Sequence, residues 1–145
     1  MDLILAYYAG FVDGEGYIGI KKDCKDKKRG YSCIYSEKVS VACNSELIIR
    51  SFNDIVVGGI YKHKPSKLSK HPYWSWEVSN EKARTFLKLI HPYLKIKKLE
   101  ADLVLALGKN KERNKKRNRV TPKDLEIRDN LYTLIKTLHT YDRYE

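Results

Sequence analysis

The segment from Leu3 to Val12 reads LILAYYAGFV and has no polar face apart from two tyrosine hydroxyls. As a helix it would be apolar all round, so both of its sides must be covered. One side would face the core of its own domain, and a chain of 145 residues has the length of a single domain. Its small residues Ala6, Ala9 and Gly10 would let a second helix backbone approach closely. The segment therefore predicts either a helix–helix dimer seam or the central helix of a monomer.

Positive charge is the second constraint, with 29 Lys and Arg against 18 Asp and Glu and a net charge of +11. This imbalance favours a polyanionic partner, either nucleic acid or an anionic membrane surface. The basic residues fall on expected strands and in a loop rather than on an amphipathic helix, which argues against a membrane. The N-terminal apolar segment lacks a basic leader and is far shorter than the roughly 20 residues of a membrane span. We therefore expect no targeting signal and no membrane partner.

Three cysteines, Cys24, Cys33 and Cys43, form an odd set without metal-ligand spacing. They predict neither a disulfide framework nor a zinc site. We infer a reducing compartment, either the cytoplasm or nucleoid of a prokaryote or an organelle matrix.

The rest of the chain changes between strand-like and helix-like patterns. Period-two alternation predicts four strands, at 17–22, 34–43, 60–64 and 73–78. Helical spacing and capping residues predict helices at about 46–56, 83–90, 96–106 and 121–140, and residues 108–120 are expected to form a basic loop. This order predicts an α+β fold in which an antiparallel sheet of two hairpins carries helices on one face. We expect a single domain over residues 1–145, with a core of about 1–107.

The polar face of the expected sheet carries lysines in a pattern that favours nucleic-acid binding. Alternation assigns to this face the residues Lys21, Lys38, Ser40, Lys62, Lys64, Ser75 and Glu77. We expect these side chains to meet base edges or flanking phosphates.

The run from Lys109 to Arg119 holds seven basic residues and one acid. We expect Lys115, Lys116 and Arg117 to contact phosphates without reading sequence. The alternative is a solvated linker before the last helix.

Two carboxylates, Asp13 and Glu15, stand at the C-terminal end of the apolar helix. The helix dipole disfavours each of them there by roughly 0.3–1 kcal/mol, and a divalent cation is the natural compensation. Mg²⁺ is commonly held by one or two carboxylates, with substrate phosphates and water completing its shell. If two copies of the helix dimerise, two Glu15 side chains converge into a site of the kind that hydrolyses phosphodiesters.

The string YAGFVDGEG at 8–16 resembles the signature of the LAGLIDADG homing endonuclease family. The resemblance extends to GGIYK at 58–62, YWSW at 73–76 and PYLKIK at 92–97, and it covers about residues 4–107. It implies an αββαββα core whose saddle-shaped, four-stranded sheet lies in the DNA major groove. Because the chain has one motif, the resemblance implies a homodimer, with Ala6, Ala9, Gly10 and Asp13 at the interface and Asp13 tying the two motif helices together.

The resemblance also implies which residues form the active site. The last acid of the motif is Glu15 here, in place of the commoner Asp, and it would ligate the catalytic Mg²⁺ with help from the Gly14 backbone. Mn²⁺ or Ca²⁺ could substitute for Mg²⁺ in binding. Lys97 matches the lysine that reaches toward the scissile phosphate, where its charge would stabilise the transition state. Lys95 and Lys98 are its neighbours and remain alternatives.

Asn44 is the nearest match to the family residue that orders active-site water, and it is equally a candidate helix cap. Together these residues predict a site-specific endonuclease that cuts a partly palindromic double-stranded DNA target. A chain of this size without splicing residues at its ends fits an intron-encoded enzyme of intron homing. The alternative is a non-catalytic RNA maturase or DNA-binding regulator of the same fold.

Overall fold

The fold follows the order of elements expected from the sequence. A computed structural model describes residues 2–24, 33–68 and 70–141. Its helices and strands are α1 (Leu3–Glu15), β1 (Gly16–Asp23), β2 (Ile34–Cys43), α2 (Glu46–Ser51), β3 (Gly59–His63), β4 (Tyr73–Ser79), α3 (Asn80–Ile90), α4 (Lys98–Arg117) and α5 (Pro122–Tyr141). Up to α3 this is the αββαββα order, so the α+β fold class is confirmed.

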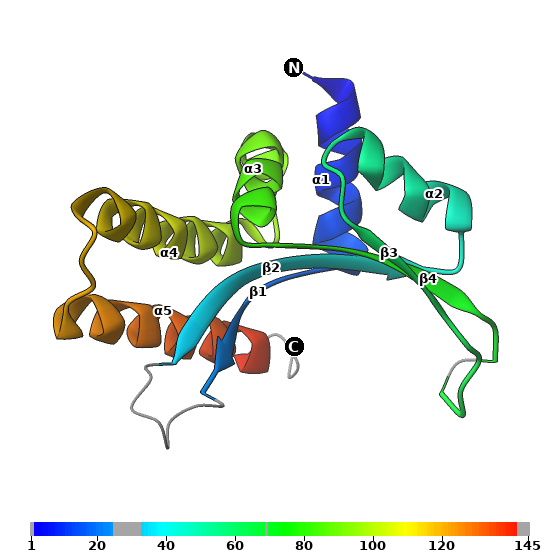
Figure 1. The fold of residues 1–145 in the computed structure, drawn as a ribbon. Coiled ribbons are helices and arrows are strands. Elements are labelled where there is room, and N and C mark those ends of the chain that lie inside the picture. Colours follow the sequence, from blue (N-terminus) through cyan, green and yellow to red (C-terminus); the bar gives the residue numbers. More distant parts are fainter. Residues whose placement is uncertain (1, 25–32, 69, 142–145) are drawn as a thin grey trace.

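The four strands form one antiparallel sheet in the order β1-β2-β4-β3. Figure 1 shows this sheet arched, with α1, α2 and α3 above its convex side and the concave side open beneath it. Ile18, Ile20, Val39 and Trp76 lie on the helix side and are buried. The expected division into an apolar inner face and a polar outer face is therefore confirmed for β1, β2 and β4.

An aromatic cluster joins the sheet to the helices that cover it. Phe52 is fully buried, and its ring contacts those of Tyr8 in α1, Trp76 in β4 and Phe86 in α3. The helix expected at 46–56 is shorter than predicted, because α2 ends at Ser51 and a 3₁₀ turn follows at Phe52–Asp54. Asn53 accounts for the ending, since its side-chain oxygen accepts hydrogen bonds from the Gly58 backbone and the Trp76 indole.

The prediction of a basic loop at 108–120 is wrong for most of these residues, because α4 continues to Arg117. Its inner face continues the helical spacing of Val104 and Leu107 with amides instead of apolar residues, and Asn110 and Asn114 are buried there. Asn110 receives hydrogen bonds from Asn114 and from Arg128 of α5. A search for apolar periodicity misses such a face. The basic residues therefore do lie on a helix, but 109–117 contains no apolar side chain that could enter a membrane.

The open edge of the sheet, β1, is covered by α5. The His139 ring nitrogen lies 2.9 Å from the Ile18 carbonyl oxygen, so α5 satisfies a backbone group that has no strand partner. Further along, Asp129 accepts hydrogen bonds from the Lys22 ammonium at 2.6 Å and the Tyr35 hydroxyl at 2.7 Å. The hydrogen bond and charge of Asp129 raise the pKa of Lys22. These contacts fix α5 against the β1–β2 hairpin.

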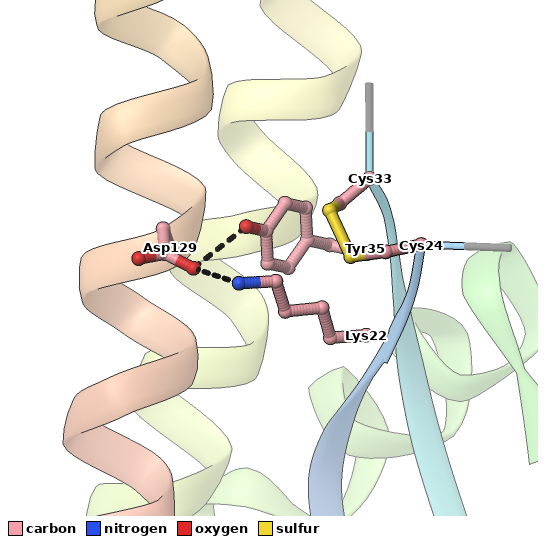
Figure 2. The surroundings of a disulfide bond; sticks show 5 residues. All are labelled: Lys22, Cys24, Cys33, Tyr35 and Asp129. Atoms are coloured by element: carbon pink, nitrogen blue, oxygen red, sulfur yellow. Dashed lines mark hydrogen bonds and ion pairs between the residues drawn. A yellow bond between two sulfur atoms is a disulfide. The ribbon is translucent and has the colours of Figure 1, made fainter. Parts of the chain in front are cut away.

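Cys24 and Cys33 form a disulfide across the same hairpin, as Figure 2 shows beside Lys22, Tyr35 and Asp129. The expectation that no disulfide forms is therefore wrong, and the reducing compartment inferred from it loses its basis. The two cysteines are nine residues apart in sequence, but antiparallel pairing brings their Cα atoms to 4.3 Å. Cys43 remains a free thiol.

A buried carboxylate ties the sheet to two helices. Glu37 of β2 is fully buried on the inner face. Arg84 of α3 and Lys111 of α4 bind its two oxygens at 2.5 Å and 2.8 Å. A buried charge is tolerated when it is paired in this way. Strand alternation does not predict this cluster, because Glu37 occupies a position where an apolar residue is expected.

Candidate functional site

The candidate site begins at the C-terminal end of α1, where Asp13 holds the segment before α4. The buried Asp13 carboxylate accepts three backbone hydrogen bonds, from Lys95 at 2.8 Å, Ile96 at 3.1 Å and Lys97 at 2.9 Å. Asp13 was expected to tie two motif helices together. Both carboxylate oxygens bind backbone groups of the same chain, and a contact with a second motif helix stays a prediction.

Lys97 lies beside the motif because of this anchoring. Its ammonium donates hydrogen bonds to two backbone carbonyls at the end of α1, Asp13 at 2.7 Å and Val12 at 3.2 Å. The Val12 carbonyl already accepts the Gly16 backbone N–H, so the cation adds a second donor there and complements the negative end of the helix dipole. Lys95 and Lys98 are more exposed, and neither makes such a contact among the described residues. Of the three candidate lysines, Lys97 is the one that the fold brings to the motif.

Glu15 is the last residue of α1, and its side chain is exposed. Among the described residues its carboxylate has no hydrogen bond or ion pair. Gly16 follows and turns the chain into β1, where a Cβ atom would come within 2.7 Å of the Val12 carbonyl oxygen. A tight helix-to-strand turn thus presents Glu15 and the Gly14 backbone to solvent, one helical turn from the Lys97 contacts.

One face of α1 is apolar and exposed, and we call it the α1 stripe. It consists of Leu3, Ile4, Tyr7, Gly10 and Gly14. A Cβ atom added at Gly10 or Gly14 would meet nothing within 4 Å, so the fold of the single chain does not require either glycine. Ala9, expected at a dimer interface, is instead fully buried against the core of its own chain, because it lies on the opposite side of the helix.

Asn44 is exposed at the end of β2, and it does not cap the next helix. Ser45 is the N-cap of α2, since its hydroxyl accepts a hydrogen bond from the Ile48 backbone at 3.4 Å. The capping interpretation of Asn44 is therefore wrong. Its side chain remains available for the water-ordering role that the resemblance implies.

The outer face of the sheet carries most of the polar residues expected there. Strand pairing places Lys21, Lys38, Ser40 and Glu77 on the concave side, opposite the core face. Lys38 and Glu77 approach to 3.9 Å, which is a loose ion pair. The sequence pattern thus found one cationic and one acidic position that lie together on the open face.

Two of the expected lysines are not on this face. Lys62 pairs in register with Trp74, so it lies on the same side as the core residue Trp76, with its ammonium 5.5 Å from the Trp74 ring centroid. Lys64 lies beyond the end of β3. The prediction failed because alternation gives the two faces of a short strand but not which of them is buried. For β3, the register with β4 decides which face is buried.

A cluster that the sequence analysis did not assign occupies the outer face of β3 and β4. His63 stacks on Tyr73 with ring centroids 4.5 Å apart, and its Nε2 lies 2.8 Å from the Ser75 hydroxyl. Ser75 is on the expected face but is nearly buried under this pair. Tyr61, which is exposed, pairs with Ser75 in register and extends the same surface. The alternation of Tyr61 and His63 was the signal that could have identified them.

Lys115, Lys116 and Arg117 form the exposed last turn of α4. Figure 1 shows α4 and α5 lying side by side at one end of the sheet. At a helix C-terminus these positive charges complement the helix dipole. They therefore stabilise α4 whether or not they also contact phosphate.

The family follows from the comparison of the sequence with known protein families. The model of the LAGLIDADG endonuclease family matches residues 8–104, from the middle of α1 into the first part of α4. The chain belongs to the LAGLIDADG endonuclease family. The match includes the motif helix with Asp13 and Glu15 and extends to Lys97 and the start of α4. No curated protein matches the sequence significantly.

Solved LAGLIDADG homing endonucleases share this fold. The chain is 21% identical to I-CvuI, which was solved in complex with its target in the presence of Ca, with a TM-score of 0.77 over 94% of this chain and 82% of that one. It is 14% identical to the archaeal intron-encoded I-Vdi141I complexed with DNA, with a TM-score of 0.73 over 94% and 84%. I-SmaMI, bound to an uncleaved DNA target, is 20% identical, with a TM-score of 0.71 over 92% and 45%. At these identities the likeness establishes the fold.

None of the described helices has the length and hydropathy needed to cross a bilayer.

Proposed function

We propose that the protein is a site-specific double-stranded DNA endonuclease that hydrolyses phosphodiester bonds as a homodimer with Mg²⁺. The observation that carries the proposal is the end of α1, where the exposed Glu15 carboxylate has no partner among the described residues and the Lys97 ammonium binds the carbonyl of Asp13, two residues earlier. A carboxylate for a metal and a cation for a phosphate are the two charges that this chemistry requires.

The homodimer is supported by the α1 stripe. Its exposed side chains Leu3, Ile4 and Tyr7 give an apolar surface, and the bare backbone at Gly10 lets a second helix approach closely. Ile96, exposed next to the end of α1, extends this surface. A two-fold axis along the stripe would bring the two Glu15 side chains together. A homodimer of this kind would bind a partly palindromic target, because each half reads the same sequence.

The donor set at the end of α1 fits Mg²⁺ held between protein and substrate. Among the described residues there is no cluster of three or more His, Cys, Asp or Glu side chains that could hold a metal alone. Mg²⁺ needs no such cage, because one or two carboxylates, water and substrate phosphates complete its shell. Glu15 would hold the ion with the Gly14 backbone, and Mn²⁺ or Ca²⁺ could replace Mg²⁺ in binding. A bound Mg²⁺ would lower the pKa of its water ligand and neutralise phosphate charge.

The chain's own residues would supply the other roles in hydrolysis. Lys97 would place positive charge beside the phosphate and stabilise the additional negative charge of the transition state. It can exchange its two carbonyl partners for a phosphate oxygen because its side chain is only partly buried. Asn44 would orient the attacking water through its amide.

Duplex DNA as the substrate is supported by the open concave face and by the relatives that were solved with DNA targets. We assign contacts with base edges or flanking phosphates to Lys21, Lys38, Ser40 and Glu77 on this face. The His63–Tyr73–Ser75 cluster would flank them on β3 and β4. Lys115, Lys116 and Arg117 would add sequence-independent phosphate contacts.

Glu15→Gln tests the proposal directly. The amide keeps the size of the side chain but removes the charge that binds the metal, so cleavage of the target duplex should fall by a factor of 10³ or more while binding persists. Cleavage in Mg²⁺ and binding in EDTA should be measured on the same DNA. A variant that cuts at the wild-type rate would exclude Glu15 as the metal ligand. A wild-type protein that binds but never cuts would favour a maturase or DNA-binding regulator of the same fold.

The biological role that fits this activity is homing of an intron that encodes the protein. Transfer of the intron into an allele that lacks it, dependent on Glu15, is the corresponding genetic test. A prokaryotic cytoplasm or nucleoid, or an organelle matrix, is where such a DNA target would be met.

A further inference from the structure

A cationic hollow of about 510 Å³ lies between the β1 edge of the sheet and α5. Its walls include Tyr17 and Lys21 of β1, Lys38 of β2 and Lys136 and His139 of α5. No Asp or Glu is among its described lining residues. We propose that this hollow binds a phosphate of the DNA backbone, and that α5 is therefore part of the DNA-binding surface.

The charges in the hollow are largely uncompensated. Lys21 makes no hydrogen bond or ion pair within the described chain, and Lys38 has only the loose contact at 3.9 Å with Glu77. The Lys136 ammonium lies 5.2 Å from the Tyr132 ring centroid and makes no ion pair among the described residues. Lys22 also lines the hollow and is paired with Asp129, but Lys21 and Lys136 have no carboxylate partner among the described residues and Lys38 has only the loose one, so the walls attract an anion.

The position of the hollow joins it to the concave face. Tyr17, Lys21 and Lys38 lie on the outer side of the sheet by their strand pairing. The α5 wall stands at the β1 edge of that side, because His139 hydrogen-bonds the Ile18 carbonyl and its ring centroid lies 5.1 Å from that of Tyr17. A duplex seated on the concave face would therefore pass the hollow at the β1 edge with one of its backbones.

The chemistry of the walls favours a phosphate over a base. Ammonium groups bind phosphate as point charges, and Arg, Asn and Gln are side chains that read base edges through paired hydrogen bonds. None of these three residue types lines the hollow. Burial raises the pKa of Tyr17, so its hydroxyl stays protonated and can donate a further hydrogen bond to a phosphate oxygen.

The inference deepens the proposed function, since it assumes duplex DNA as the ligand, but its test does not depend on cleavage. Lys136→Gln removes one charge from the α5 wall, and Lys88→Gln removes one from an exposed position on α3, on the helix side of the sheet. Phosphate contacts are independent of sequence, so a mixed-sequence duplex in EDTA serves as the probe. Binding should be measured by fluorescence anisotropy over a range of KCl concentrations.

We expect Lys136→Gln to weaken binding several-fold and to reduce the log–log salt slope by about 0.9, the value for one phosphate contact. Lys88→Gln should leave both quantities unchanged, and the melting temperatures of both variants should match that of the wild type. Equal slopes for the two variants, or no salt-dependent binding by the wild type, would overturn the inference.

Inorganic phosphate distinguishes DNA from a free anion as the ligand. Phosphate should displace the duplex no better than chloride does at equal ionic strength. Saturable binding of inorganic phosphate that Lys136→Gln abolishes would make the hollow a free-anion site instead. If the wild type never cuts DNA but Lys136→Gln still weakens duplex binding, the phosphate site in the hollow is supported and the proposed nuclease activity is not.

Discussion

At the scale of single residues, the two acids of the motif differ most in what they contact. Asp13 is buried and accepts three backbone hydrogen bonds, whereas Glu15 is exposed and has no described partner. The sequence placed both at the end of one helix, but their side chains leave the helix in different directions. One acid is therefore part of the fold, and the other is free for a ligand.

Asp13→Ala should destabilise the protein by about 3 kcal/mol, because it leaves three partly buried N–H groups without their charged acceptor. It should also release the segment that carries Lys97, so cleavage would fall together with stability. The free energy of unfolding in urea is the measurement. Glu15→Gln is the matched control, and its stability should remain within about 0.5 kcal/mol of the wild type. A similar loss for both variants would contradict the structural role given to Asp13.

At the scale of elements, α5 depends on how its first turn is capped. The Thr121 hydroxyl accepts a hydrogen bond from the Asp124 backbone at 3.2 Å, and the Asp124 carboxylate accepts one from the Thr121 backbone at 2.9 Å. This reciprocal pair is a capping box in which Asp replaces the usual Glu. The Thr121 backbone N–H and hydroxyl, in that order, hold the pKa of Asp124 below its ordinary value of 3.8.

The lowered pKa predicts how stability depends on pH. A carboxylate with a depressed pKa in the folded state stabilises the protein fully above its unfolded-state value. The contribution is lost as the pH falls below about 3.8 toward the folded-state pKa. The stability advantage of wild type over Asp124→Asn should therefore be constant near neutral pH and shrink below pH 3.8. Thermal melts of both proteins between pH 7 and 3 test this, and an advantage that is unchanged at the lowest pH would refute it.

At the scale of the whole molecule, the α1 stripe decides whether one chain or two make the functional unit. Gly10→Leu adds a large side chain at a position where the single chain leaves open space, so the fold should tolerate it. It should separate the two helix backbones of a dimer, since close approach depends on the missing side chain. We expect a folded monomer without cleavage activity. Sedimentation velocity measures whether the variant is a monomer, and circular dichroism measures whether it is folded.

Gly16→Ala provides the contrast for that experiment. Its Cβ atom would clash with the Val12 backbone of the same chain. This variant should therefore be less stable than the wild type but should still dimerise. If Gly10→Leu remained dimeric, or if the wild type were monomeric both free and on DNA, the stripe would not be the interface.

The order of elements and the motif helix, with Glu15 at its end, could be read from the sequence alone. These depend on local signals, namely period-two alternation in the strands, an apolar segment bounded by glycines, and a motif that spans few residues. For the same reason the inward positions of Ile18, Val39 and Trp76 could be predicted.

Tertiary contacts were needed to establish which face Lys62 takes, that residues 108–117 continue a helix, and that Cys24 pairs with Cys33. They were also needed to establish that Asp13 serves its own chain. Each of these depends on a partner distant in sequence: the register of β3 on β4, the amides that pack α4 on α5, the antiparallel pairing of β1 with β2, and the segment before α4. Local patterns encode what a residue prefers, and only packing selects the partner it meets.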